Sequence, residues 1–194
     1  MGGVVFLKNN GSASFFNCSF VENFAQVGGL FYGEHHKSLE IKYFNIFNNS
    51  AITSSIMYSQ LSYENTTFDT GIASNNEVNQ SLTKYKSRIN EPYSPFNDHQ
   101  IRLENGKLYI LKTIIENQPN FLSGSSSVLT LENTVLRNTV MTKSTMFLLE
   151  NGSEIQLTNI SITNFTKPES DYQDVSIFSM FSNSLLLASD SFLY

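Results

Sequence analysis

The chain has 194 residues and a formal net charge of −5, with 40% hydrophobic but only 15% charged residues. Its single cysteine excludes a disulfide within the chain, and the lack of a basic block argues against nucleic-acid binding. No apolar run reaches the ~18 residues of a membrane span. The length and the hydrophobic content fit one domain, or a piece of a larger one, with its own core.

Pairs of short apolar segments recur along the chain. They lie at residues 4–6 and 14–17, 30–32 and 39–42, 120–122 and 129–132, and 146–148 and 155–158. In each pair a large apolar residue is followed ten positions later by another: Phe6 and Phe16, Phe31 and Ile41, Phe121 and Leu131, Phe147 and Leu157. A unit of 21–26 residues with this internal pattern indicates a repeat architecture.

Short polar residues mark the turns of each unit. Asn-Gly at Asn10, Asn105 and Asn151 precedes the second segment, and Asn-Gly supplies the positive φ of a tight corner. The closing positions are predicted to be Asn23, Asn48 or Asn49, Thr70, Asn117, Asn138 and Asn164. Stacked asparagines at a fixed corner can hydrogen-bond one another, so we expect an asparagine ladder.

The alternation within units has period two. Leu129 and Leu131 are expected to face inward and Thr130 outward, which is strand patterning. One unit cannot bury its apolar face, whereas stacked units can, with Phe6 over Phe31 and Leu131 over Leu157. The spacing therefore predicts a parallel β-solenoid; an antiparallel β-sandwich is the alternative.

The first two units carry a narrower motif. Gly2-Gly3-Val4 is followed by Phe20-Val21-Glu22-Asn23, and then by Gly28-Gly29-Leu30. This pattern resembles the GGA-(I/L/V) and FxxN repeats of polymorphic outer-membrane adhesins of chlamydial type, within the pectin-lyase-like superfamily. The resemblance implies an all-β fold: a right-handed parallel β-helix of about seven rungs with one long inserted loop.

The expected division is rungs 1–3 at residues 1–70, an inserted loop at 71–99, and rungs 4–7 at 100–194. The insertion breaks the repeat with charged residues and prolines. Neither end shows a polar capping helix, which solenoids use to cover open edges. We therefore expect a fragment of a longer solenoid or a subunit that associates with itself end to end.

Asp69 and Glu116 are the candidate acids of an enzyme. If the insertion adds no rung, both precede closing positions on neighbouring strands, about 4.8 Å apart, as a retaining glycosidase requires. The opposing interpretation is a solvated face on which Glu116 forms an ion pair with Arg137. Motifs of polygalacturonases and pectate lyases are not found, so the chain is predicted not to be an enzyme. A polysaccharide lyase or glycoside hydrolase of the β-helix type is the alternative.

Other polar groups give weaker signals. His35-His36 beside Glu34 is interpreted as a solvated corner, because adjacent strand residues point to opposite faces. Asp98-His99 with Arg102 and Glu104 is a modest candidate for a polar pocket, or a loop anchor. Cys18 is expected to be a small core residue. No metal site and no cofactor are predicted. The tyrosines outside the main columns are candidates for surface contacts: Tyr63, Tyr85, Tyr93 and Tyr172.

Eight Asn-x-Ser/Thr acceptors point to a secreted glycoprotein. Asn10 and Asn151 lie on expected exposed turns and Asn79 in the loop, so these three are the predicted glycosylation sites. The prediction is a non-enzymatic, extracellular or cell-surface β-solenoid with a structural or adhesive role. It would be a filament subunit or part of a longer surface protein. A module that binds glycans without catalysis is a further hypothesis, and it needs a face of exposed tyrosines.

Overall fold

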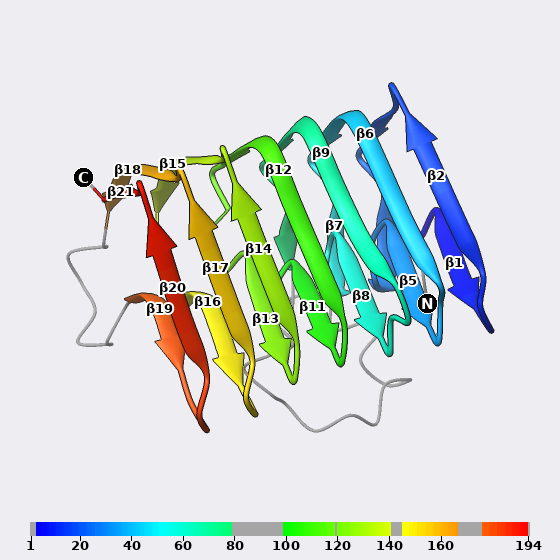
Figure 1. Ribbon diagram of the computed structural model, residues 1–194. Coiled ribbons are helices and arrows are strands. Elements are labelled where there is room, and N and C mark those ends of the chain that lie inside the picture. Colours follow the sequence, from blue (N-terminus) through cyan, green and yellow to red (C-terminus); the bar gives the residue numbers. More distant parts are fainter. Residues whose placement is uncertain (1–2, 79–98, 119, 141–144, 167–175, 194) are drawn as a thin grey trace.

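The computed structural model describes residues 3–78, 99–118, 120–140, 145–166 and 176–193. These residues are all-β, with no helix among them, and their strands form long parallel sheets stacked side by side (Figure 1). The arrangement is compatible with a β-helix. The described part of the chain contains no helix with the length and hydrophobicity that crossing a bilayer requires.

One sheet has seven strands in chain order. They are β1 (Val5–Lys8), β5 (Phe31–Glu34), β8 (Met57–Gln60), β11 (Ile101–Glu104), β13 (Leu122–Ser125), β16 (Thr145–Glu150) and β19 (Ser176–Met180). Each strand pairs in parallel with the next, so residues at equivalent positions form columns across the sheet. Between neighbouring strands the chain travels through the other sheets and returns.

A second, eleven-stranded sheet follows the same order. Its main strands are β2 (Ser12–Phe16), β6 (Ser38–Phe47), β9 (Asn65–Ser74), β12 (Lys107–Glu116), β14 (Val128–Glu132), β17 (Glu154–Thr158) and β20 (Leu185–Ser189). Four further strands extend it beyond a corner: β3 (Ser19–Val21), β15 (Val135–Val140), β18 (Ser161–Thr166) and β21 (Phe192–Leu193). A small third sheet joins β4 (Phe24–Val27), β7 (Ser50–Thr53) and β10 (Glu77–Val78).

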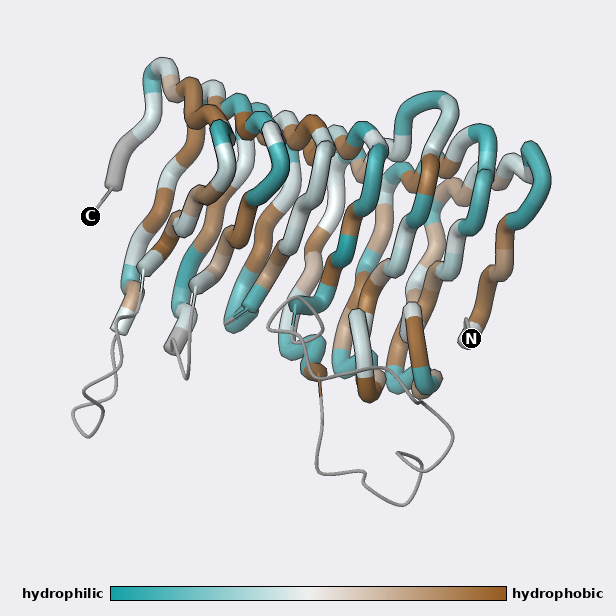
Figure 2. Tube along the Cα trace, turned by 90° about the horizontal axis from the view of Figure 1, so that it is seen from below, coloured by the Kyte–Doolittle hydropathy of each residue, from teal (hydrophilic) through white to brown (hydrophobic). Residues whose placement is uncertain are grey.

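The core lies between the sheets and follows the period-two pattern. Leu129 and Leu131 are buried while Thr130 is half-buried on the outside, as predicted. Leu131 pairs with Leu157, which confirms that expected column. Figure 2 shows hydrophobic stretches along the strands and hydrophilic residues at many of the corners. Similar apolar side chains thus stack on one another over the length of the sheets.

The expected column of Phe6 over Phe31 is wrong. Val5 pairs with Phe31, and Phe6 pairs with the outward Tyr32. Phe6 and Phe16 are 48% and 67% exposed, whereas Phe31 is 1% exposed. The inward residues of the first unit are Val5 and Phe15, one position earlier than the repeat alignment placed them. A shift of one residue turns every side chain of a strand to the other face.

Residues with positive φ occur at each corner of the chain. One corner holds Glu22, Asn48, Asn75, Asn117, Asn138 and Asn164, all with φ near 50°. Thr70 was expected here, but it belongs to a different corner with Asn17, Tyr43, Lys112, Asn133, Asn159 and Asp190. Backbone amides and carbonyls join successive layers at both corners, as Asn117 N to Arg137 O at 3.2 Å illustrates.

The asparagine ladder exists in two forms. On the outside, Asn117 Nδ2 donates to Asn75 Oδ1 at 2.7 Å and Asn164 Nδ2 to Asn138 Oδ1 at 3.0 Å. A second, inner ladder is formed by the residues that follow Glu22, Asn48 and Asn75 in the chain. There Asn23 Nδ2 donates to Asn49 Oδ1 and Asn49 Nδ2 to Asn76 Oδ1, both at 2.9 Å. The inner ladder supplies partners to backbone groups that the corner would otherwise leave buried and unpaired.

The Gly-Gly motif has a steric reason. Gly28 has φ +61°, a conformation that L side chains rarely adopt. A Cβ on Gly29 would lie 2.0 Å from Ser55 O, and one on Gly3 would lie 2.3 Å from Gly29 O. The backbones of successive layers therefore approach so closely here that only a residue without a side chain fits at Gly3 and Gly29.

The strand pattern extends past residue 70, where the insertion was expected to begin. Residues 71–74 complete β9, pairing with β6 and β12, and Glu77–Val78 form β10. Residues 79–98, most of the expected insertion, lie outside the described residues. His99 and Gln100 are buried, and Ile101 begins β11 beside Met57 of β8. The two flanking parts therefore share one continuous sheet.

Candidate functional site

Aromatic rings form a stacked column on the outer face of the seven-stranded sheet. Phe6, Tyr32, Tyr58 and Arg102 occupy equivalent positions on β1, β5, β8 and β11. Ring centroids are 5.3 Å apart for Phe6 and Tyr32 and 5.2 Å for Tyr32 and Tyr58, and the Arg102 guanidinium lies 5.4 Å from the Tyr58 centroid. Both faces of Tyr32 and Tyr58 are therefore covered, and neither ring offers a free face to a sugar.

The adjacent outward column is polar. Lys8 Nζ lies 3.1 Å from Glu34 Oε2, and the column continues through Gln60 to Glu104. Arg102 and Glu104 form an ion pair at 2.5 Å, and their side chains are only 22% and 19% exposed. Much of the charge on this face is thus neutralised by a partner on the same or a neighbouring strand.

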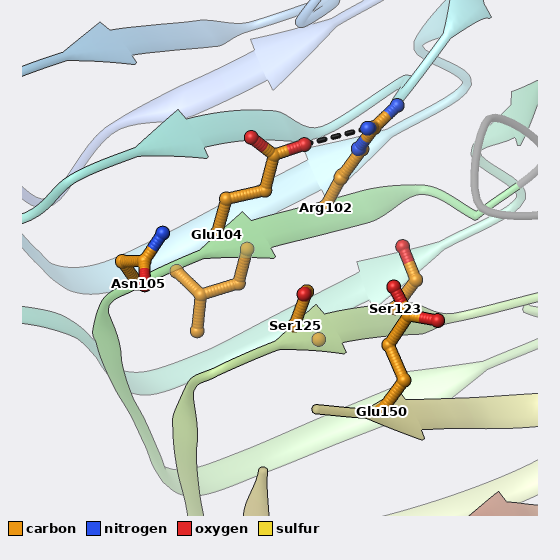
Figure 3. Close-up of a pocket in the computed structure, with 8 residues that line it drawn as sticks. Arg102, Glu104, Asn105, Ser123, Ser125 and Glu150 are labelled. Atoms are coloured by element: carbon orange, nitrogen blue, oxygen red, sulfur yellow. Dashed lines mark ion pairs between the residues drawn. The ribbon is translucent and has the colours of Figure 1, made fainter. Parts of the chain in front are cut away.

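A pocket of about 120 Å³ interrupts this face over β13. The outward residues of β13 are Ser123 and Ser125, whereas the flanking strands carry Arg102 and Glu104 on one side and Glu150 on the other. We call this pocket the β13 notch. Figure 3 shows its lining, with the Glu104 carboxylate turned toward Arg102. The notch exists because the small side chains of Ser123 and Ser125 take the places next to Arg102 and Glu104 in two neighbouring columns.

The chemistry of the β13 notch is that of a small polar recess. Asn151 Nδ2 donates to Ser125 Oγ at 2.9 Å, which leaves the Ser125 hydroxyl hydrogen free to donate. Glu104 and Glu150 stand two strand spacings apart, about 10 Å. The recess can accept a hydroxyl-bearing or cationic group of a few heavy atoms.

Sequence reasoning singled out Arg102 and Glu104 but missed the other residues of the notch. His99, expected beside them, is buried elsewhere, with Nε2 3.1 Å from Thr145 O, and Asp98 lies outside the described residues. Aligning 101–104 with 122–125 as repeats would have revealed the signal, since Arg-x-Glu is replaced by Ser-x-Ser.

The proposed carboxylate pair is not formed. Asp69 pairs with Leu111 and Lys42, while Glu116 pairs with Ser74 and Arg137. The two acids are five positions apart along the strands, because Thr70 and Asn117 occupy different corners. The hypothesis of a nucleophile and acid at Asp69 and Glu116 is therefore wrong.

Glu116 belongs to a local ion pair, as the opposing interpretation predicted. Asn138 Nδ2 donates to Glu116 Oε1 at 2.7 Å, and Arg137 Nε lies 3.5 Å from the same oxygen. The Asn138 hydrogen bond, followed by the positive charge of Arg137, lowers the pKa of Glu116 below its ordinary value. A carboxyl group stabilised in its ionised form is poorly suited to donate a proton at neutral pH.

His35 and His36 face different surroundings. His35 lies at a positive-φ corner, with Nδ1 3.2 Å from the Tyr63 hydroxyl. His36 is 1% exposed, so the expectation of a solvated corner is wrong for it; Nε2 lies 3.4 Å from Thr66 Oγ1 and Nδ1 is buried without a partner. Among the described residues no group of three or more His, Cys, Asp or Glu is arranged to hold a metal ion.

His36 should make the fold sensitive to acid. Burial lowers the pKa of His36 below its ordinary 6.5. The unfolded chain therefore binds this proton at a higher pH than the folded one, and stability falls as the pH drops below about 6.5. We expect a loss of up to ~1.4 kcal/mol per pH unit there, measured by urea unfolding at pH 7.5 and 5.5. His36→Gln should weaken this dependence and His35→Gln should leave it; equal profiles in all three proteins would contradict the assignment.

Tyr63 is the expected surface tyrosine that the structure describes, and it is 62% exposed. It borders an open groove with Glu40, Glu64 and Asn65. Cys18 is partly buried against the core, and its thiol donates to Phe16 O at 3.3 Å, in line with a small core residue. Tyr85, Tyr93 and Tyr172 lie outside the described residues.

The acceptor asparagines differ in their surroundings. Asn10 is exposed at a corner with φ 67°, and Asn151 is exposed but donates its amide to Ser125. Asn79 lies outside the described residues. Asn159 and Asn164 donate to Asn133 and Asn138 in the outer ladders. Of the two predicted sites that the structure describes, Asn10 is exposed at its turn, whereas the Asn151 amide is already engaged by Ser125.

No family model, curated protein sequence or solved structure matches the chain.

Proposed function

We propose that the chain is a right-handed parallel β-helix of about seven rungs with a structural or adhesive role outside the cell and no catalytic activity of its own. The strand order, the in-register columns and the positive-φ corners support the helix. The Gly-Gly and Phe-x-x-Asn positions support its likeness to repeats of the pectin-lyase-like, outer-membrane adhesin kind. In this proposal the solenoid is a rod that presents its outer faces and associates with itself through its end rungs.

One observation carries the structural role: on the outer face of the seven-stranded sheet, most aromatic rings and charged groups already contact a partner on the same face. The faces of Tyr32 and Tyr58 are stacked against neighbours, and Glu104 is paired with Arg102. Catalysis needs groups that are aimed at a substrate and are not neutralised by each other. Stacked rings and paired charges of this kind instead reinforce the stacking of the strands.

A polysaccharide lyase or glycoside hydrolase is the second candidate, and the β13 notch is the observation that favours it. The strand positions of Glu104 and Glu150 are about 10 Å apart, slightly more than the ~6.5–9.5 Å that separates the two carboxyl groups of inverting glycosidases. Glu104 is, however, held in an ion pair with Arg102 at 2.5 Å, and this pair would have to open before the Glu104 carboxyl group could reach a substrate.

Secreted material from a eukaryotic host tests the proposal in one experiment. The protein is incubated with acidic and neutral polysaccharides, and new reducing ends and unsaturated products are followed beside an authentic lyase. We expect no turnover above background. Turnover that disappears in Glu104→Gln or Glu150→Gln but persists in Glu116→Gln would overturn the non-enzymatic role and establish the second candidate.

The same material tests the predicted glycosylation sites. Mass spectrometry of its glycopeptides should find Asn10 occupied, together with Asn79 and Asn151 to whatever extent their surroundings allow. Secreted, folded protein with no glycan at any of the three asparagines would contradict the assignment of these acceptors.

A further inference from the structure

One of the eight Asn-x-Ser/Thr acceptors has an exposed aromatic residue two positions before it. Tyr63, Asn65 and Thr67 lie at alternate positions, and Asn65 with Thr67 forms the acceptor motif. Tyr63 is 62% exposed, and Asn65 is exposed as well. Asn17 also follows an aromatic residue at this spacing, but that residue, Phe15, packs against the core. Asn65 therefore combines an acceptor amide with a neighbouring ring that is open to solvent.

The three side chains border one groove. In β9, Asn65 and Thr67 flank the buried Thr66, so both point outward. The groove lies over β6, β9 and the turn before β9, and it is lined by Ser38, Glu40, Tyr63, Glu64, Asn65 and Thr67. We call it the Tyr63 groove. Its volume is about 490 Å³. Sites for small molecules have volumes of ~300–1,000 Å³, so a sugar attached to Asn65 has room beside the ring.

The turn that carries Tyr63 is fixed by the preceding layer. Tyr63 N donates to His36 O at 3.0 Å. Glu64 N donates to Lys37 O at 2.8 Å. The Tyr63 hydroxyl lies 3.2 Å from His35 Nδ1, and the two ring centroids are 6.3 Å apart. The tyrosine ring is thus held in place before a sugar arrives, which reduces the conformational entropy that packing a sugar against it would cost.

The acids of the Tyr63 groove are balanced by lysines. Glu64 Oε1 lies 3.5 Å from Lys37 Nζ. Glu40 Oε1 lies 2.7 Å from Lys42 Nζ. The groove therefore has little net charge with which to attract an ion. Its carboxylate, hydroxyl and amide oxygens can still accept hydrogen bonds, and the tyrosine ring offers an apolar face. A neutral sugar, with hydroxyl groups and a face of C–H bonds, matches this chemistry.

We propose that Asn65 is an N-glycosylation site and that the first sugar of its glycan packs on Tyr63 in the Tyr63 groove. This rests on the extracellular role proposed above and adds a modification site to it. The donor is a lipid-diphosphate oligosaccharide, which a membrane transferase of the secretory pathway brings to the chain. The Asn65 amide nitrogen forms a bond to C1 of the first N-acetylglucosamine, and the bond from C1 to the diphosphate breaks. The lipid diphosphate leaves, and the amide loses one proton to the transferase.

Mass spectrometry of glycopeptides tests the site, with the full chain secreted from a eukaryotic host. We expect Asn65 to be occupied in most molecules. Asn65→Gln and Thr67→Ala should each remove one glycan, which is seen as a loss of mass in the intact protein. Thr67→Ser is the matched control, because it changes the same side chain, keeps the acceptor motif and should keep the glycan.

Tyr63→Ala tests the packing, since it removes the ring and keeps the acceptor. The glycan is trimmed to its first sugar, and the melting temperature of each protein is compared with that of the same protein carrying Asn65→Gln. We expect the sugar to raise the melting temperature by about 2 °C when the Tyr63 ring is present, and not to raise it in Tyr63→Ala. Tyr43→Ala is the matched control, because Tyr43 is 53% exposed at a different corner, and there the increase should persist.

Two outcomes overturn the proposal. Secreted, folded protein without a glycan at Asn65 excludes the site. An occupied Asn65 whose first sugar changes the melting temperature equally with and without the Tyr63 ring excludes the packing. Fractionation of the cells that make the protein locates the native chain independently, so failure of this site is distinguishable from failure of the extracellular role.

Discussion

Replacing Asn49 by alanine is expected to destabilise the first three layers of strands by at least ~3 kcal/mol. Asn49 is fully buried, and its Nδ2 donates to Phe20 O and to Asn76 Oδ1, both at 2.9 Å. Its Oδ1 accepts from Asn23 N at 3.0 Å. Alanine would leave these groups buried without partners, and each such group costs about 1–3 kcal/mol.

Hydrogen exchange and urea unfolding measure this effect. Protection should be lost in β3, β6 and β9, while β14, β17 and β18 keep theirs, because each layer of a repeat protein depends mainly on its neighbours. Asn48→Gly is the matched control: Asn48 is exposed with φ 52°, which glycine adopts freely, so its change should stay within about 1 kcal/mol. Equal losses in the two variants would refute a special role of the inner ladder.

The second large effect is expected at Phe31. Its ring is 1% exposed and lies 5.3 Å from the Phe20 ring, 5.9 Å from Phe15 and 6.3 Å from Phe68. Phe31→Ala should lower the free energy of unfolding by about 3–5 kcal/mol, because the cavity is enclosed by neighbours that cannot fill it.

Phe6→Ala is the control that tests the register as well. Phe6 is 48% exposed and stacks on Tyr32, so its loss should cost about 0.5–1.5 kcal/mol. The two midpoints of urea unfolding should differ clearly. A loss at Phe6 as large as that at Phe31 would mean that Phe6 faces the core, as the repeat alignment had suggested.

Asp69 and Glu116 are not neighbours in the structure, so the outer surface has no pair of acids where the sequence suggested one. Thr70 and Asn117 both end an apolar stretch and both have positive φ, so the sequence offered no local way to tell their corners apart. The register shows that Thr70 shares its corner with Lys112, and Asn117 shares its corner with Asn75. The acids next to these corners are separated accordingly, and the polar recess lies instead at the β13 notch.

Half of the notch was visible in the sequence. Arg102 and Glu104 were recognised as a polar pair, but they were associated with His99, which is buried away from the notch. Ser125 and Glu150 carry no motif by themselves. They became part of a recess only because parallel pairing places them beside Glu104 at successive strands.

The sequence by itself determined that the protein is all-β with stacked parallel strands, because period-two burial and positive-φ turns are properties of a few consecutive residues. It also determined the column of Leu131 and Leu157 and the presence of an asparagine ladder. Only the tertiary structure decided that Phe6 faces outward, which corner Thr70 occupies, and where the notch lies. These depend on which residue of one strand lies beside which residue of a strand about 25 positions away, and a slip of one residue leaves the local pattern almost unchanged while it reverses the face.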